Sequence, residues 1–251
     1  LTELQAHPDA RDPEPFAGPD HPIRVLTRAV AFGKEWKPEH AERMSTLFNE
    51  LAPSWSTDHV DAVKAAPVLD ALERGDVPLA GHWLEVGSGT GAGARVLDGQ
   101  VGSLVCTDLS AGMLRHAPDL APRAQSDASA LPFNADSFDA VLLINMLLFP
   151  SEIDRVVRPG GTVLWINTLG DQTPIHLPAV DVLEALPGEW VGTTADAGTG
   201  FWLTARRARR ITPLRHGHEL AFSLIAVVAV LAAACSTTAQ VSEPRDIGVP
   251  T

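Results

Sequence analysis

Apolar runs and amphipathic stretches alternate through the middle of the chain. The apolar runs predict strands near residues 82–86, 103–107, 122–126, 138–144 and 161–167. The other stretches predict helices near residues 91–99, 111–117, 150–157 and 178–186. Alternation of strand and helix is typical of a parallel sheet that helices cover on both faces. Two more strands, near 189–194 and 200–206, lack a helix between them and predict an antiparallel hairpin.

Residues 23–51 carry apolar residues at helical spacing. These residues are Ile23, Leu26, Val30, Met44, Leu47 and Leu51. A further helix is expected from Val60 to Leu72, bent or restarted at Pro67. Residues 1–22 hold five prolines and little apolar periodicity, which predicts a flexible or extended arm without a secretory signal.

The strand near 82–86 ends in an acid and breaks into a glycine-rich turn, Glu85-Val86-Gly87-Ser88-Gly89-Thr90-Gly91. Glycine lets a ligand approach the backbone closely, because no Cβ stands in the way. A helix that starts after such a turn presents free N–H groups. We therefore expect a nucleotide-sized pocket at the carboxyl end of this strand. The glycines fit both the dinucleotide fingerprint G-x-G-x-x-G/A and the pattern E-x-G-x-G-x-G.

Four later segments favour the second pattern. Asp108 ends the next strand, 21 residues after Gly87, where a carboxylate can accept hydrogen bonds from ribose hydroxyls. The four segments are D-L-S-A-G-M-L (108–114), S-D-A-S-A-L-P-F (126–133), S-F-D-A-V-L-L-I-N (137–145) and R-P-G-G-T-V-L (158–164). Together with the glycine turn, they resemble in order and spacing the motifs of class I S-adenosylmethionine (SAM) dependent methyltransferases. Singly, each has a simpler interpretation: a loop acid, a helix cap at Asp108 or Ser110, or a plain turn.

The resemblance implies a fold, a cofactor and a set of site residues. The fold is α/β: a Rossmann-like, mostly parallel sheet of seven strands with helices on both faces and a C-terminal hairpin. The core would span residues 81–208, with residues 23–80 as a helical lid. SAM would be the cofactor, with the Asp127 side chain taking the adenine amino group and Asn145 touching the methionyl part or the acceptor. The implied cofactor-binding residues are Glu85, Gly87, Ser88, Gly89, Thr90, Gly91, Asp108, Leu109, Met113, Asp127, Ala128 and Asn145.

The sequence of the expected lid resembles one branch of this methyltransferase family. Met44 to Trp55 resembles the F-x-x-x-A-P-x-Y/W entry of ubiquinone and menaquinone C-methyltransferases. Trp55 occupies the aromatic place, as a ligand contact or as a packing residue between lid and core, and Met146 is a second candidate for substrate contact. The segment 145–158 is short and apolar where relatives carry a longer helical segment. We therefore expect a small, apolar acceptor.

Methyl transfer would be an in-line displacement on the methyl carbon, in which the protein mainly aligns the reactants and excludes water. A general base helps only an acceptor that starts protonated with a high pKa. His176, Asp171 and His59 are candidates, and each is equally an ordinary loop or helix residue, so the catalytic residue is left unassigned. A SAM- or nucleotide-binding module without transfer activity is the alternative, because the general-base position of some relatives is not visible here.

Composition and charge disfavour several other classes of function. The chain has no tyrosine, so the Tyr-x-x-x-Lys pair of an NAD(P) oxidoreductase cannot exist. Residues 1–205 carry 13 basic and 28 acidic residues, and this acidic body disfavours nucleic acid as a partner. The two cysteines, Cys106 and Cys235, provide neither a disulfide framework nor a zinc spacing, so we expect no metal and a cytoplasmic protein.

Residues 209–251 form a basic and apolar tail that we expect to lie outside the core. Leu220 to Cys235 is apolar except for Ser223. At about 1.5 Å per residue, this run is shorter than a hydrocarbon core of roughly 30 Å. Three interpretations are open: a read-through extension, which we favour; an anchor that associates the protein with a membrane through residues 220–235; and a helix that packs on the body or forms a dimer contact.

Overall fold

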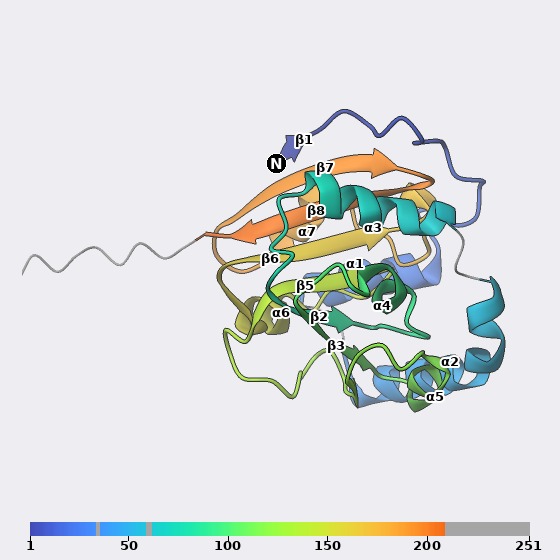
Figure 1. The fold of residues 1–251 in the computed structure, drawn as a ribbon. Helices are drawn as coiled ribbons and strands as arrows, with labels where there is room; N and C mark the ends of the chain where they lie inside the picture. The colour runs from blue at the N-terminus through green and yellow to red at the C-terminus, as the bar shows by residue number, and fades with distance from the viewer. Residues whose placement is uncertain (34–35, 59–61, 209–251) are drawn as a thin grey trace, which may run out of the picture. The chain divides into compact units, whose positions relative to one another are not determined.

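The computed structural model describes residues 1–33, 36–58 and 62–208, and these residues form one mixed sheet. The sheet order is β1-β7-β8-β6-β5-β2-β3-β4, and every pair is parallel except those of β8 with β6 and β7 (Figure 1). The strands are β1 (Thr2–Glu3), β2 (His82–Val86), β3 (Ser103–Asp108), β4 (Arg123–Gln125), β5 (Phe138–Ile144), β6 (Val157–Asn167), β7 (Trp190–Ala197) and β8 (Gly200–Arg207). The predicted mostly parallel α/β sheet and its C-terminal antiparallel hairpin are confirmed.

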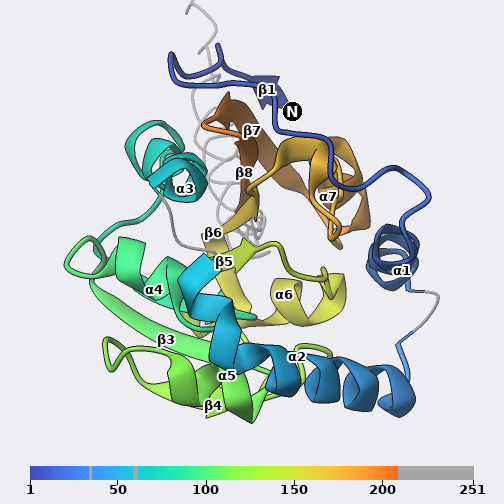
Figure 2. The same cartoon turned by 90° about the vertical axis from the view of Figure 1, so that its right-hand side faces the viewer.

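Helices cover both faces of the sheet (Figure 2). On one face, Val68 of α3 and Leu97 of α4 pack with Trp83 and Trp202 of the sheet. On the other face, α6, α7 and the end of α1 pack in a cluster that includes Trp165. The helices are α1 (Pro22–Ala31), α2 (Pro38–Asp58), α3 (Ala62–Arg74), α4 (Ala92–Leu97), α5 (Ala111–His116), α6 (Pro150–Val156) and α7 (Ala179–Ala185), and a 3₁₀ helix, η1, spans Gly170–Gln172.

The central strand β5 shows why the apolar runs of this sequence are continuous. Ala140 and Leu142 belong to the cluster on one face of the sheet, whereas Val141 and Leu143 belong to the cluster on the other. All four side chains are fully buried. A strand that is covered on both faces needs apolar residues at every position, and this requirement replaces the alternating pattern of a half-exposed strand.

The sheet has eight strands, one more than the sequence predicts, because the N-terminal arm contributes β1. Thr2 and Glu3 pair in parallel with Thr193 and Thr194 of β7. Beyond β1, the arm makes a turn at Pro8 and Asp9, and the backbone N–H of Arg11 donates to the carbonyl of Gly198 at 2.8 Å. The arm therefore lies against the hairpin and is held there by backbone hydrogen bonds, which a proline-rich polar sequence does not reveal.

Two predicted elements differ in detail from the structure. The strand expected near 161–167 already begins at Val157, and its first part is irregular: Phe138 pairs with Val157, whereas Ala140 pairs with Thr162, and Gly160 has a φ of 82°. The extra residues form a bulge in the pairing with β5. α3 runs through Pro67 as one helix, so the alternative of a restart there is wrong.

The basic and apolar tail at residues 209–251, with all its proposed roles, lies outside the described residues. Within the residues that are described, no helix combines the length and apolar character needed to cross a membrane.

Candidate functional site

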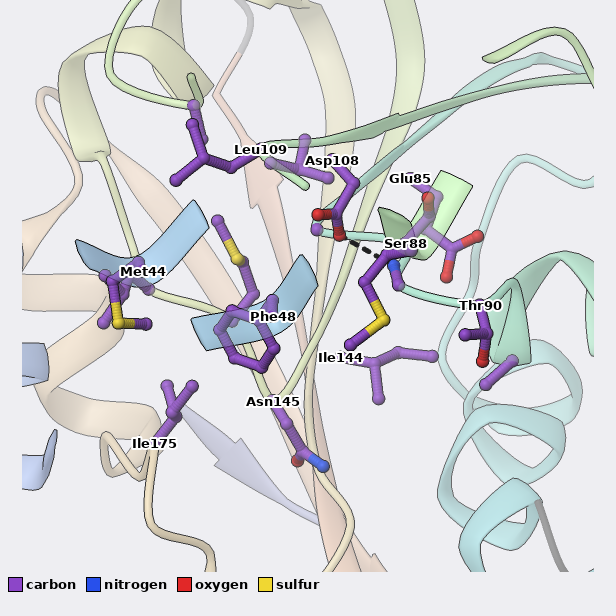
Figure 3. A pocket seen from close by; sticks show the side chains of 18 of the residues that line it. Met44, Phe48, Glu85, Ser88, Thr90, Asp108, Leu109, Ile144, Asn145 and Ile175 are labelled. Carbon is purple, nitrogen blue, oxygen red and sulfur yellow. Dashed lines mark hydrogen bonds between the residues drawn. The ribbon is translucent and has the colours of Figure 1, made fainter. Parts of the chain in front are cut away.

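The carboxyl ends of β2, β3 and β5 open into a cavity of about 610 Å³. Polar residues that include Glu85, Ser88 and Asp108 lie on one side, and Met44 and Ile175 lie on the other (Figure 3). Parallel α/β sheets bind ligands at this edge, where neighbouring strands lead to helices on opposite faces. From the predicted cofactor set, the wall contains Glu85, Gly87, Ser88, Gly89, Thr90, Asp108, Leu109, Met113, Asp127, Ala128 and Asn145.

The glycine turn needs glycine for two different reasons. Gly87, Gly89 and Gly91 all have positive φ, at 69°, 54° and 81°. A Cβ added to Gly87 would lie 2.3 Å from the Sδ of Met146, whereas one added to Gly89 would meet only the indole nitrogen of Trp55, at 3.9 Å. Gly87 therefore lets Met146, in the segment after β5, pack closely against the turn. Gly89 leaves its backbone open to the cavity. Gly91 precedes α4 as its N-cap and does not line the cavity.

Asp108 is held at the end of β3 by two backbone donors. Its Oδ2 accepts from the N–H of Gly89 at 2.8 Å, as Figure 3 shows, and its Oδ1 accepts from the N–H of Ser110 at 2.7 Å. Burial raises the pKa of this carboxyl, and the two hydrogen bonds act in the opposite direction. Ser110, and not Asp108, caps α5, because its hydroxyl accepts from the N–H of Met113. Asp108 is thus free of a capping role, and its carboxylate remains part of the cavity wall.

Glu85 is buried and faces the start of α4. Burial raises its pKa to about 7, while the thiol of Cys106 and the backbone N–H groups of Ala94 and Gly93 lower it. A Cβ on Gly93 would lie 2.2 Å from Oε1 of Glu85. The sequence predicts free N–H groups at this helix start, but in the structure Glu85 occupies them. Sequence reasoning missed Gly93, whose only signal is a small residue near the beginning of the helix that follows the turn.

The segment after β4 also lines the cavity, with Ser126, Asp127 and Ala128. Oδ1 of Asp127 accepts from the N–H of Ser129 at 2.8 Å, and Oδ2 accepts from the indole N–H of Trp36 at 3.0 Å. The hydroxyl oxygens of Ser126 and Ser88 are buried and have no hydrogen-bond partner among the described residues. Such groups are rare in folded proteins, because an unpaired buried hydroxyl is unfavourable. Both residues line the cavity, so its wall holds two polar groups without a partner in the described chain.

Apolar side chains from five separate segments form the opposite side. Met44, Phe48 and Trp55 come from α2, and the Phe48 and Trp55 rings pack edge to face with centroids 5.6 Å apart. Both predicted substrate contacts, Trp55 and Met146, line the cavity. The sequence did not single out the remaining apolar wall, because its members come from the arm, α1, α2, the segment after β5 and the loop after β6: Phe16, Ile23, Leu47, Leu51, Leu147, Phe149, Leu169, Pro174 and Ile175.

Asn145 links the ends of β5 and β6 beneath this apolar side. Its Oδ1 accepts from the backbone N–H of Thr168 at 2.9 Å, and its Nδ2 donates to the Thr168 hydroxyl at 2.8 Å. Its φ is 47°, a left-handed conformation that asparagine tolerates better than most residues. The side chain fixes where the loop after β6 leaves the sheet, and that loop then covers the cavity.

Neither described candidate for a general base lines the cavity. His176 lies in the loop after β6, where its Nδ1 is 3.0 Å from the carbonyl oxygen of Gly170 and its ring packs against Phe201. Burial lowers the pKa of His176. Asp171 is exposed. The third candidate, His59, lies outside the described residues.

Comparison with known proteins agrees with this geometry. Residues 84–165, which run from β2 into β6, match the family model described as "Methyltransferase domain". This segment is similar to methyltransferase domains. It contains the glycine turn, Asp108, Asp127 and Asn145, whereas the lid, the arm and the C-terminal hairpin lie outside the matched segment.

The relatives of this chain are proteins of very different size. The chain is 32% identical over 108 residues to a demethylmenaquinone methyltransferase of Clavibacter sepedonicus, covering 38% of this chain and 44% of that protein. It is 27% identical over 168 residues to the PKS-NRPS hybrid synthetase cheA of Chaetomium globosum, covering 56% of this chain and 4% of that protein. The chain therefore spans less than half the length of either relative.

A solved structure shows the same fold. The solved structure titled "DhpI-SAH complex structure" superimposes with a TM-score of 0.56 and 20% identity, covering 68% of this chain and 97% of that one. This similarity extends beyond the matched segment and supports a Rossmann-like methyltransferase fold for the sheet and its helices.

Proposed function

We propose that this chain binds SAM in the cavity and transfers its methyl group to a small, apolar acceptor. SAM would supply a methyl group on a sulfonium centre. An O, N, S or C nucleophile would attack the methyl carbon in line, the carbon–sulfur bond would break, and S-adenosylhomocysteine would leave. The family match and the name of one relative support methyl transfer, and one solved structure with a similar fold is titled as a complex with SAH, the demethylated product of SAM.

The nucleoside part of SAM fits the polar side of the cavity. Asp108 would accept hydrogen bonds from the ribose hydroxyls, since the two backbone donors leave acceptor positions on both of its oxygens. Leu109 and Met113 would line the adenine ring, and Asp127 would accept from its amino group. The unpartnered hydroxyls of Ser88 and Ser126 lie in the same part of the cavity and would gain hydrogen-bond partners there.

The charge of the cavity favours a cation over a dinucleotide. Among the described residues that line it, the charged side chains are Glu85, Asp108 and Asp127, all acidic. A dinucleotide carries an anionic pyrophosphate, which such folds bind with the N–H groups at the start of the first helix. Here the N–H groups of Gly93 and Ala94 interact with Glu85. The sulfonium and ammonium groups of SAM suit this acidic environment better than NAD(P) does.

The apolar side of the cavity would hold the acceptor. Met44, Phe48 and Ile175 face the polar side across the cavity (Figure 3), so an acceptor among them would lie beside the cofactor. Apolar walls exclude water from the reacting groups, which keeps the nucleophile unsolvated and aligned. Methionine side chains adapt to ligands of varied shape, and all three methionines of the chain line this cavity.

The observation that carries the proposal is the hydrogen bond between the Asp108 carboxylate and the backbone N–H of Gly89 in the wall of a half-apolar cavity. The test is incubation of the full chain with methyl-tritiated SAM and a panel of phenols, quinols, indoles and apolar amines, followed by organic extraction. We expect label in at least one extract, reduced at least tenfold by Asp108→Asn. SAM binding without label in any extract would favour the alternative, a SAM-binding module without transfer activity.

A further inference from the structure

A tryptophan outside the matched methyltransferase segment reaches the polar side of the cavity. Trp36 lies between α1 and α2, and its indole N–H donates to Oδ2 of Asp127 at 3.0 Å, 91 residues along the chain. The Trp36 ring meets Phe149 edge to face, with centroids 5.1 Å apart and planes at 77°. Such a contact restrains the ring plane and therefore the direction of its N–H. Trp36 itself is part of the cavity wall.

The Asp127 carboxylate is restrained at both oxygens. The N–H of Ser129 donates to Oδ1 at 2.8 Å, while Trp36 donates to Oδ2. Rotation of the carboxylate would break one or both hydrogen bonds. An ionised carboxylate has about four acceptor positions, so each oxygen keeps one position for a ligand. The plane of the carboxylate is thus set by one donor from its own turn and one from the lid.

We infer that Trp36 is a positioning residue that fixes the Asp127 carboxylate as an acceptor and makes the site select a 6-aminopurine over a 6-oxopurine. The inference depends on the proposed SAM-binding function. An amino group donates to a fixed carboxylate, whereas a 6-oxo group places a second acceptor opposite it. Sites built to hydrogen-bond a particular group reject analogues that leave buried polar atoms unpaired. A carboxylate that can rotate away loses that discrimination, so selectivity requires the Trp36 contact.

The test compares two ligands on the full chain by calorimetric titration: S-adenosylhomocysteine and its 6-oxo analogue, S-inosylhomocysteine. The variants are Trp36→Phe, which keeps an aromatic ring without the N–H, and Trp36→Leu, so that the result does not depend on one variant folding. Trp190→Phe is the matched control, because the Trp190 indole donates to the carbonyl of Pro187 outside the cavity. Circular dichroism checks folding.

We expect the unsubstituted chain to prefer the adenosyl ligand by roughly 100-fold, since a site that hydrogen-bonds one polar group discriminates strongly. Trp36→Phe should reduce this preference by about tenfold, in line with one hydrogen bond to a charged group. Trp190→Phe should leave it unchanged. In an Asp127→Ala background, Trp36→Phe should have no further effect on the preference, because the group it positions is gone.

If the Trp36 variants leave the preference unchanged, the inference is overturned. Equal weakening of binding for both ligands would then mean that Trp36 only supports the lid. Failure of the unsubstituted chain to bind either ligand would instead overturn the proposed function, and binding of both ligands with equal affinity would overturn the selectivity inference alone.

Discussion

Asp108 accepts a hydrogen bond from the backbone N–H of Gly89 across the gap between two adjacent strand ends, at 2.8 Å. β2 and β3 pair in parallel from His82↔Ser103 to Val86↔Thr107, so their carboxyl ends lie side by side. The turn after β2 must therefore pass in front of the residue that ends β3. This register explains how two residues 19 positions apart form one wall of the cavity, and it makes Asp108 the most direct test of the site.

Gly93→Ala should destabilise the protein, because the new Cβ would lie 2.2 Å from the buried Glu85 carboxylate. Overpacking of this kind lowers the free energy of unfolding by about 1–3 kcal/mol, more than the helix propensity that alanine gains. Urea unfolding measures the difference. Gly18→Ala is the control, since an added Cβ there meets nothing within 4 Å. Equal stability of the two variants would show that Glu85 can move away without loss.

Glu85→Gln should change how stability depends on pH. The folded-state pKa of Glu85 is about 7, raised by burial from an ordinary value of 4.5. Between these values the folded protein binds more protons at Glu85 than the unfolded chain does, so the stability contributed by Glu85 falls as the pH rises. From pH 4.5 to pH 8, the free energy of unfolding of the unsubstituted protein should fall relative to Glu85→Gln by about 1–3 kcal/mol. A difference that stays constant across this range would contradict the raised pKa.

Ser126→Ala should weaken ligand binding without weakening the fold. The Ser126 hydroxyl is buried in the cavity wall and has no hydrogen-bond partner among the described residues, so its removal takes no hydrogen bond from the folded protein. We expect a melting temperature that is unchanged or higher, and a Kd for S-adenosylhomocysteine about 3- to 10-fold higher, as for one neutral hydrogen bond. Ser137→Ala, at a hydroxyl that donates to the Asn134 carbonyl, is the control and should leave the Kd unchanged.

The sequence was sufficient where a feature depends on neighbours along the chain. The glycine turn and Asp108 follow apolar runs directly, and parallel strands bring their ends together without further information. The β1 pairing and the Trp36–Asp127 contact could not be predicted, because each joins segments far apart in the sequence and carries no local pattern.

The catalytic candidates also show that the sequence does not reveal where a loop side chain points. His176 was a candidate because a histidine near a strand end can reach a pocket, but in the structure it packs against Phe201 and does not line the cavity. The direction of a loop side chain depends on the packing around it. The apolar wall was also beyond the sequence, since the arm, α1, α2 and the loop after β6 each contribute only a few of its residues.

The most direct test of the central claim is calorimetric titration of the full chain with SAM, S-adenosylhomocysteine and NADH. The same titrations are made on Asp108→Ala and on Asp119→Ala, whose exposed carboxylate lies outside the cavity. We expect micromolar binding of both adenosyl ligands to the unsubstituted chain and to Asp119→Ala, at least tenfold weaker binding to Asp108→Ala, and no binding of NADH. A folded protein that binds neither adenosyl ligand, or an Asp108→Ala variant that binds them unchanged, would contradict the assignment of this cavity as a SAM site.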